Sequence, residues 1–134
     1  MIGFERRLSL ELMPERIAIC RLAADDPLPP WALAARYWSI TRTPDELSVV
    51  CPEAVVPSHV AASRGWRALR FEGPLPLDQT GILASVTGPL AQARVSLFAL
   101  ATYDTDYVLI PAAQQSQAIA ALEAAGHRVA SAGV

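Results

Sequence analysis

The chain has 134 residues, 52% of them hydrophobic, which is enough for one domain or two small ones to bury a core. Its formal net charge of -2 and pI of about 5.6 leave no overall basic field, so the composition argues against a nucleic-acid partner. All eleven cationic residues are arginine, and lysine and asparagine are absent. This usage indicates codon bias from a GC-rich, bacterial genome.

No apolar stretch approaches the roughly 18 to 20 residues that a membrane-spanning helix needs, and the charged N-terminal residues do not fit a signal peptide. We therefore expect a cytoplasmic protein without a membrane partner. In a reducing compartment, Cys20 and Cys51 are expected to be small buried hydrophobic residues. The two histidines complete no zinc-binding spacing, so no metal site is expected.

The first half of the chain contains short, alternating apolar stretches separated by proline-containing connections, a pattern typical of β-hairpins. In chain order, we predict a hairpin of strands 8–12 and 17–22 with its turn at Met13–Arg16, a connection at 23–30, a helical turn at 31–35, a second hairpin of strands 37–42 and 47–51, and a short helix within 54–62. A boundary after this helix gives two domains, 1–64 and 65–134.

The second half alternates strand and helix patterns. In chain order, we predict a strand at 66–72, a helix at 79–94 capped by Asp78 or Thr80 and kinked or restarted at Gly88-Pro89, strands at 95–101 and 107–110, a helix at 114–125, and a final strand at 127–130. A βαββαβ order is typical of the ferredoxin-like α+β fold, which has a four-stranded antiparallel sheet with two helices on one face.

The first half also looks like a shortened copy of the second. Placing residues 41–50 beside 101–110, at a spacing of 60, aligns Glu46 with Asp106 and two apolar strands behind them. This comparison predicts a tandem repeat whose first member is degenerate.

Two stretches carry a resemblance to a known family: Asp78-Gln79-Thr80-Gly81-Ile82-Leu83 at the helix start, and residues 96–109 across the next two strands. Here the chain resembles the ACT domain family, small βαββαβ modules that bind amino acids and regulate metabolic enzymes. In particular it resembles short, free-standing bacterial tandem-ACT proteins, which are similar to the regulatory half of aspartate kinases and to the cytosolic arginine sensor of animals.

The resemblance implies two ACT modules in tandem, the first degenerate, and a regulatory protein that forms a homodimer and needs no cofactor. The ligand, an amino acid, would lie where one module's first loop and helix start meet a strand edge of its neighbour. Because one module supplies only part of such a site, the remainder would come from residues 39–47 or from another copy.

The resemblance also implies roles for individual residues. Backbone groups near Gly81 and Ile82 would hold the ligand carboxylate, since a helix N-terminus favours anions. Asp78 and Asp106 would meet its cationic groups, and Tyr103 would close over its side chain. The predicted ligand-binding residues are Asp78, Thr80, Gly81, Ile82, Leu83, Thr102, Tyr103 and Asp106.

Other interpretations account for the same residues one at a time. Asp78 and Thr80 suit a helix cap, Asp104 and Asp106 a solvated turn, and Tyr103 a packing position. An enzyme would use these aspartates as acid and base, but no histidine or activated nucleophile accompanies them, so we expect no enzyme. The remaining alternative is a ligand-free interaction module in which the sheets of two copies join.

Overall fold

The computed structural model describes residues 7–75 and 80–131. Its contacts divide the chain into two compact units, which we describe separately. Unit 1 contains the residues up to Pro14 and those from Arg67 onward, and unit 2 contains Glu15–Trp66. The predicted division into modules 1–64 and 65–134 stays a prediction.

The first strand, β1 (Ser9–Leu22), contributes to both units and is continuous, so the predicted hairpin with a turn at Met13–Arg16 is wrong. The tightest hairpin turns need glycine, asparagine or aspartate, and this segment has none. Pro14 removes one N–H donor but has a φ that extended chain accepts. The alternation therefore identified the strand correctly and the turn incorrectly.

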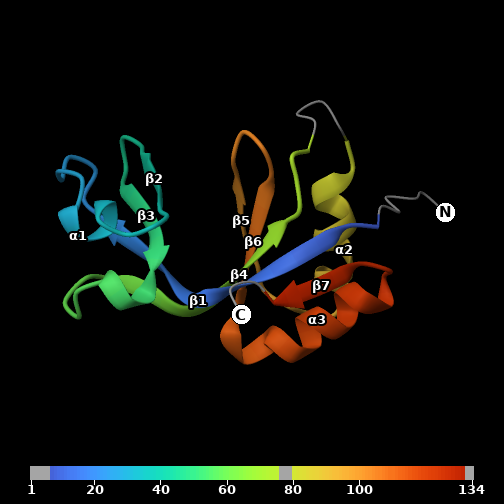
Figure 1. Ribbon diagram of the computed structural model, residues 1–134. Helices are drawn as coiled ribbons and strands as arrows, with labels where there is room; N and C mark the ends of the chain where they lie inside the picture. Colours follow the sequence, from blue (N-terminus) through green and yellow to red (C-terminus); the bar gives the residue numbers. More distant parts are fainter. Residues whose placement is uncertain (1–6, 76–79, 132–134) are drawn as a thin grey trace. The chain divides into compact units, whose positions relative to one another are not determined.

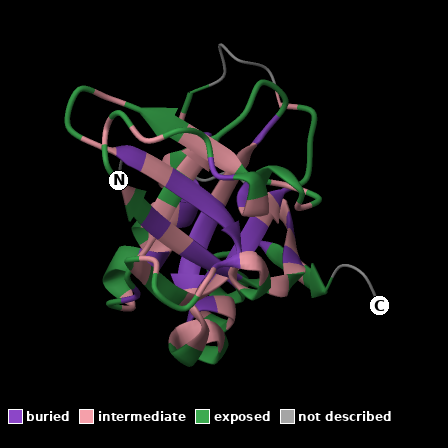
Figure 2. Cartoon of the chain, turned by 90° about the vertical axis from the view of Figure 1, so that its left-hand side faces the viewer, coloured by how far each residue is buried: buried purple, intermediate pink, exposed green. Residues whose placement is uncertain are grey.

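Unit 2 is built on the strand order β2-β3-β1-β4, with β2 (Ser39–Arg42) and β3 (Leu47–Pro52) forming the predicted second hairpin. A short helix, α1 (Pro30–Leu33), packs on this sheet. Figure 2 shows that buried residues run along the strands while connections are exposed. The core of unit 2 consists of Ala18, Cys20, Ala32, Leu47, Val49, Cys51 and Val56.

The two cysteines are both buried in this core, as predicted, and neither forms a disulfide. Their strands are adjacent, and the Cys51 thiol donates a hydrogen bond to the Cys20 sulfur. This bond lowers the pKa of Cys20. The same bond, together with burial, raises the pKa of Cys51.

The segment after β3 holds only a 3-10 turn, η1 (Glu53–Val55), in place of a longer helix within 54–62. The next strand, β4 (Ala62–Phe71), begins earlier than the predicted 66–72. Gly65 lies inside it with a φ of +79°. Because left-handed backbone interrupts the two-residue period of a strand, Gly65 explains the irregular alternation of this stretch.

Unit 1 contains the predicted βαββαβ order, with strands β5 (Phe98–Ala101), β6 (Asp106–Pro111) and β7 (Arg128–Ser131). Its sheet has the order β5-β6-β4-β1-β7, so the start of β1 adds a fifth strand to the expected four. β7 pairs with residues Ser9–Leu12 of β1 in parallel. The ferredoxin-like α+β fold is confirmed, with one strand inserted between its first and last strands.

The two helices of unit 1, α2 (Ile82–Gln92) and α3 (Gln115–Ala124), contact each other and share a core with β1, β4 and β6 (Figure 1). Because these strands contribute alternate residues, both helices cover the same face of the sheet. This core consists of Leu10, Leu12, Leu69, Phe71, Ile82, Val86, Leu90, Val95, Val108, Ile110, Ala118 and Leu122.

Helix α2 continues through Gly88 and Pro89, so the predicted restart does not occur. Proline cannot donate to the carbonyl four residues earlier, that of Ser85. The Nε2 atom of buried His127 lies 2.8 Å from this oxygen, while its Nδ1 accepts the N–H of Leu8 at 3.0 Å. Since a carbonyl only accepts and an N–H only donates, the ring is neutral with its proton on Nε2. His127 thus supplies the hydrogen bond that Pro89 removes.

Elements of unit 2 recur in unit 1 at a fixed spacing of 59 residues. β2 begins at residue 39 and β5 at residue 98 (98 − 39 = 59), and β3 and η1 recur as β6 and η2 (Ala112–Gln114) at the same spacing. The strand pairings of the two hairpins have the same register. The sequence comparison at a spacing of 60 was therefore one residue off, and Asp106 corresponds to Leu47 rather than to Glu46.

Candidate functional site

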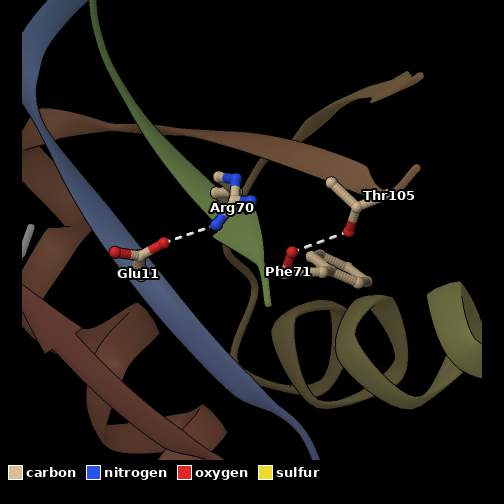
Figure 3. A network of polar contacts seen from close by, with 4 residues as sticks. All are labelled: Glu11, Arg70, Phe71 and Thr105. Atoms are coloured by element: carbon tan, nitrogen blue, oxygen red, sulfur yellow. Dashed lines mark hydrogen bonds and ion pairs between the residues drawn. The ribbon is translucent and has the colours of Figure 1, made fainter. Parts of the chain in front are cut away.

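The segment that follows β4 is hydrogen-bonded to the turn between β5 and β6. The N–H of Leu75 donates to the carbonyl of Asp104 at 2.7 Å, and the buried Thr105 Oγ1 donates to the carbonyl of Phe71 at 2.6 Å (Figure 3). A Cβ atom on Gly73 would lie 3.1 Å from the Asp104 carbonyl and 3.2 Å from the Thr105 Cβ. A side chain at position 73 would therefore push these two segments apart by a few tenths of an ångström, which favours glycine there.

The turn itself is held by its own threonines. The Thr102 N–H donates to the Thr105 carbonyl at 2.8 Å, the Thr102 hydroxyl donates to the same oxygen at 2.9 Å, and the Thr105 N–H donates to that hydroxyl at 3.3 Å. Between them, Tyr103 is 80% exposed. The interpretation of Tyr103 as a packing residue is therefore wrong, because its side chain is exposed to solvent at a turn that three hydrogen bonds close.

Helix α2 begins after Gly81, whose φ is +78°. Among the described residues, no side chain forms a cap hydrogen bond at this end, so the predicted capping role of Thr80 is wrong. Asp78 lies outside the described residues. Ile82 is buried, so only its backbone faces a ligand, whereas the Leu83 side chain is 37% exposed. An uncapped helix start presents backbone N–H groups and the positive end of the helix dipole.

Asp106 begins β6 opposite Ala101, and it is half-buried. Alternation along the strand places it on the same face as Val108 and Ile110, whose side chains lie in the core with those of α2. Its carboxylate forms no ion pair with any described cation. Asp106 thus carries an unneutralised negative charge on the sheet face that α2 covers.

Arg67 and Arg70 of β4 both have partners within the chain. Arg70 forms an ion pair with Glu11 at 2.6 Å (Figure 3). Burial acts to lower the pKa of Arg70, but hydrogen bonds with Glu11 and Tyr107 outweigh it and raise this pKa overall. Arg67 donates to the side chain of Gln115 and to a backbone carbonyl. Within the described ranges, no group of three or more His, Cys, Asp or Glu residues is placed to hold a metal ion.

The structure thus assigns the predicted site residues to two segments of unit 1. Thr102 and Tyr103 belong to the β5–β6 turn and Asp106 begins β6, while Thr80 and Gly81 precede α2 and Ile82 and Leu83 form its first turn. Sequence reasoning missed Gly73 and Thr105, which fasten the β4–α2 connection to the turn. The Gly-Pro pair at 73–74 was an available signal for a tight connection.

Comparison with known proteins identifies the family. The model of the ACT domain matches residues 61–124, and a model of another family's N-terminal domain matches residues 15–59. Residues 61–124 belong to the ACT domain family. Among the helices that the structure describes, none is long and apolar enough to cross a membrane.

The chain is similar to a solved protein of its own size, Atu0741 from Agobacterium tumefaciens, with 34% identity, a TM-score of 0.90 and 96% coverage of each chain. It is 43% identical over 47 residues to the human cytosolic arginine sensor for mTORC1 subunit 1, covering 34% of this chain and 14% of the sensor. The chain spans about half or less of the curated relatives it matches.

The chain also shares its fold with the aspartate kinase of Clostridium acetobutylicum. The TM-score is 0.60 at 9% identity, covering 87% of this chain and 33% of the kinase. At this identity the likeness concerns the fold alone. The chain thus contains an ACT domain, is similar in part of its sequence to the cytosolic arginine sensor, and shares its fold with the regulatory subunit of an aspartate kinase.

Proposed function

We propose that the protein is a cytoplasmic sensor that binds a free amino acid in unit 1, between the start of α2 and the β5–β6 turn. The observation that carries the proposal is the pairing of a helix start that no described side chain caps with Asp106, a carboxylate without a cationic partner in the described residues. The similarity of 47 residues to the cytosolic arginine sensor supports an amino acid as the ligand class.

The two charges of an amino acid complement these two features. The α-carboxylate would accept hydrogen bonds from the first N–H groups of α2, where the helix dipole favours an anion. The α-ammonium would pair with Asp106 in a charge-assisted hydrogen bond. Exposed Tyr103 and Leu83 would contact the ligand side chain and so contribute to the choice between amino acids.

We propose no catalytic function. His127, buried in unit 1, uses both ring nitrogens in structural hydrogen bonds and has none left for proton transfer. The same proposal includes assembly of two copies, as the resemblance implied. A ligand-free dimerisation module remains the second candidate, because β5 lies at the end of the strand order and Phe98–Ala101 carries no charge that would discourage pairing with another sheet.

Thermal unfolding with each of the twenty amino acids tests the proposal. An amino acid at 100 times its dissociation constant stabilises the folded protein by about 2.7 kcal/mol. Asp106→Asn should abolish the stabilisation while keeping the side chain's size. Asp45→Asn, which removes an exposed carboxylate from the equivalent turn of unit 2, is the matched control and should keep it. If no amino acid stabilises the protein, the dimerisation module is favoured.

A further inference from the structure

The spacing of 59 residues extends beyond the hairpins into the helices and the sequence. Residues 30–55 align with residues 89–114 without a gap and are identical at eight positions. These identities include two prolines, two alanines of a helix end, and the first and third residues of each turn. The identical pairs are Pro30 and Pro89, Ala32 and Ala91, Ala34 and Ala93, Thr43 and Thr102, Asp45 and Asp104, Val49 and Val108, Pro52 and Pro111, and Ala54 and Ala113.

Backbone hydrogen bonds repeat with the same spacing. The N–H of Ala34 donates to the Pro30 carbonyl at 3.1 Å, and that of Ala93 donates to the Pro89 carbonyl at 3.1 Å. In the turns, the Thr43 N–H donates to the Glu46 carbonyl at 2.9 Å, and the equivalent Thr102 N–H donates to the Thr105 carbonyl at 2.8 Å. The likeness thus holds at the level of individual bonds, which a chance match of two hairpins does not explain.

The two copies diverge where a proline enters the first one. Val56, which precedes Pro57, is extended with φ −82° and ψ 121°, whereas its counterpart Gln115 is helical with φ −56° and ψ −47°. A residue before proline is disfavoured in the helical region. The first copy therefore leaves its 3-10 turn for a loop, while the second continues into α3.

The first copy has also lost both parts of the proposed ligand site. Leu47 stands where the second copy has Asp106, and it is fully buried in the core of unit 2. The four-residue helix α1 corresponds to the last turn of α2, so the start of α2 has no helical counterpart. The position equivalent to Gly81 is Leu22, the last residue of β1.

We infer that the chain is an internal duplication in which unit 2 has given up ligand binding, so that each chain takes up one amino acid, through the copy that carries Asp106. This inference rests on the proposed function. It adds the number of amino acids bound per chain and names Asp106 as the residue that distinguishes the binding copy from the other. Unit 2 keeps the turn geometry of Thr43–Glu46, but it has Leu47 in place of Asp106 and no helix start equivalent to that of α2.

Calorimetric titration of the full chain with the twenty amino acids, one at a time, tests the inference. We expect one equivalent bound per chain, lost in Asp106→Leu and retained in Asp45→Asn. Two equivalents per chain, or binding that survives Asp106→Leu and disappears in Asp45→Asn, would overturn it.

The melting temperature of Asp106→Leu provides a measurement that does not depend on binding. Because the equivalent strand holds Leu47 in its core, the variant should melt at or above the wild-type temperature. A melting temperature lowered by several degrees would overturn the equivalence of the two positions. If the wild-type protein binds none of the amino acids, the proposed function and the one-ligand stoichiometry both fail. The melting temperature of Asp106→Leu then tests the internal duplication by itself.

Discussion

Replacing His127 by alanine tests how α2 tolerates its internal proline. The substitution leaves the Ser85 carbonyl and the Leu8 N–H without the partners they have at 2.8 and 3.0 Å. A buried polar group left unsatisfied costs about 1–3 kcal/mol, so we expect a loss of at least about 2 kcal/mol in the free energy of unfolding. In Pro89→Ala, residue 89 regains an N–H that can donate to Ser85. His127→Ala should then cost about 1–3 kcal/mol less than in the wild-type background.

Urea unfolding of the four proteins in this double-mutant cycle measures the effect. Far-UV circular dichroism follows the helices, most of which belong to unit 1, whereas all three tryptophans lie in Glu15–Trp66 and report on unit 2. The predicted change is a shift of the dichroism midpoint at constant slope. Equal costs of His127→Ala in both backgrounds would refute the idea that His127 compensates for Pro89.

Three further predictions concern the site and the cores. Thr105→Val keeps the shape of the side chain but leaves the Phe71 carbonyl unpaired, so chemical denaturation should show a loss of about 1–3 kcal/mol. Gly81→Ala puts a Cβ on a residue with φ +78° and should cost about 1–2 kcal/mol, measured in the same way; an unchanged midpoint would mean that this backbone relaxes easily. Cys20 and Cys51 should resist iodoacetamide in the folded protein and react as two thiols per chain in urea, and rapid alkylation of the native protein would contradict their burial.

The sequence was informative where one local signal decided the structure. Alternation and helical spacing predicted the βαββαβ order of unit 1, and the turn residues from Thr43 onward predicted the second hairpin. Both patterns depend on residues close together in the sequence, so they can be recognised without knowledge of the tertiary structure. The resemblance to the ACT family rested on these same segments and is confirmed by the match over residues 61–124.

Sequence reasoning failed where distant residues decide. Pro14 was read as part of a turn, yet β1 stays extended because it pairs with β4 on one side and with β3 and β7 on the other. Pro89 was expected to interrupt its helix, and the residue that compensates, His127, lies 38 positions away (127 − 89 = 38). No local pattern connects two such residues.

The ligand-binding role of the candidate residues stays a prediction, and the contacts around them were not foreseen. The start of α2 and the β5–β6 turn were expected to act together, and the structure shows a hydrogen bond from Leu75, in the segment that follows β4, to Asp104 of this turn. The roles of individual side chains changed, because Thr80 forms no cap and Tyr103 does not pack. The exposure of a side chain and its role as a helix cap depend on tertiary packing, which the intrinsic propensities of residue types do not describe.

NMR can locate the bound amino acid directly. In a titration of the 15N-labelled chain with the most stabilising amino acid, we expect amide shift changes concentrated in residues 80–84 and 102–106. The amide signals of the Thr43–Glu46 turn of unit 2 serve as the internal reference and should not shift. Shift changes confined to unit 2, or absent from the start of α2, would show that the amino acid does not bind at the proposed site.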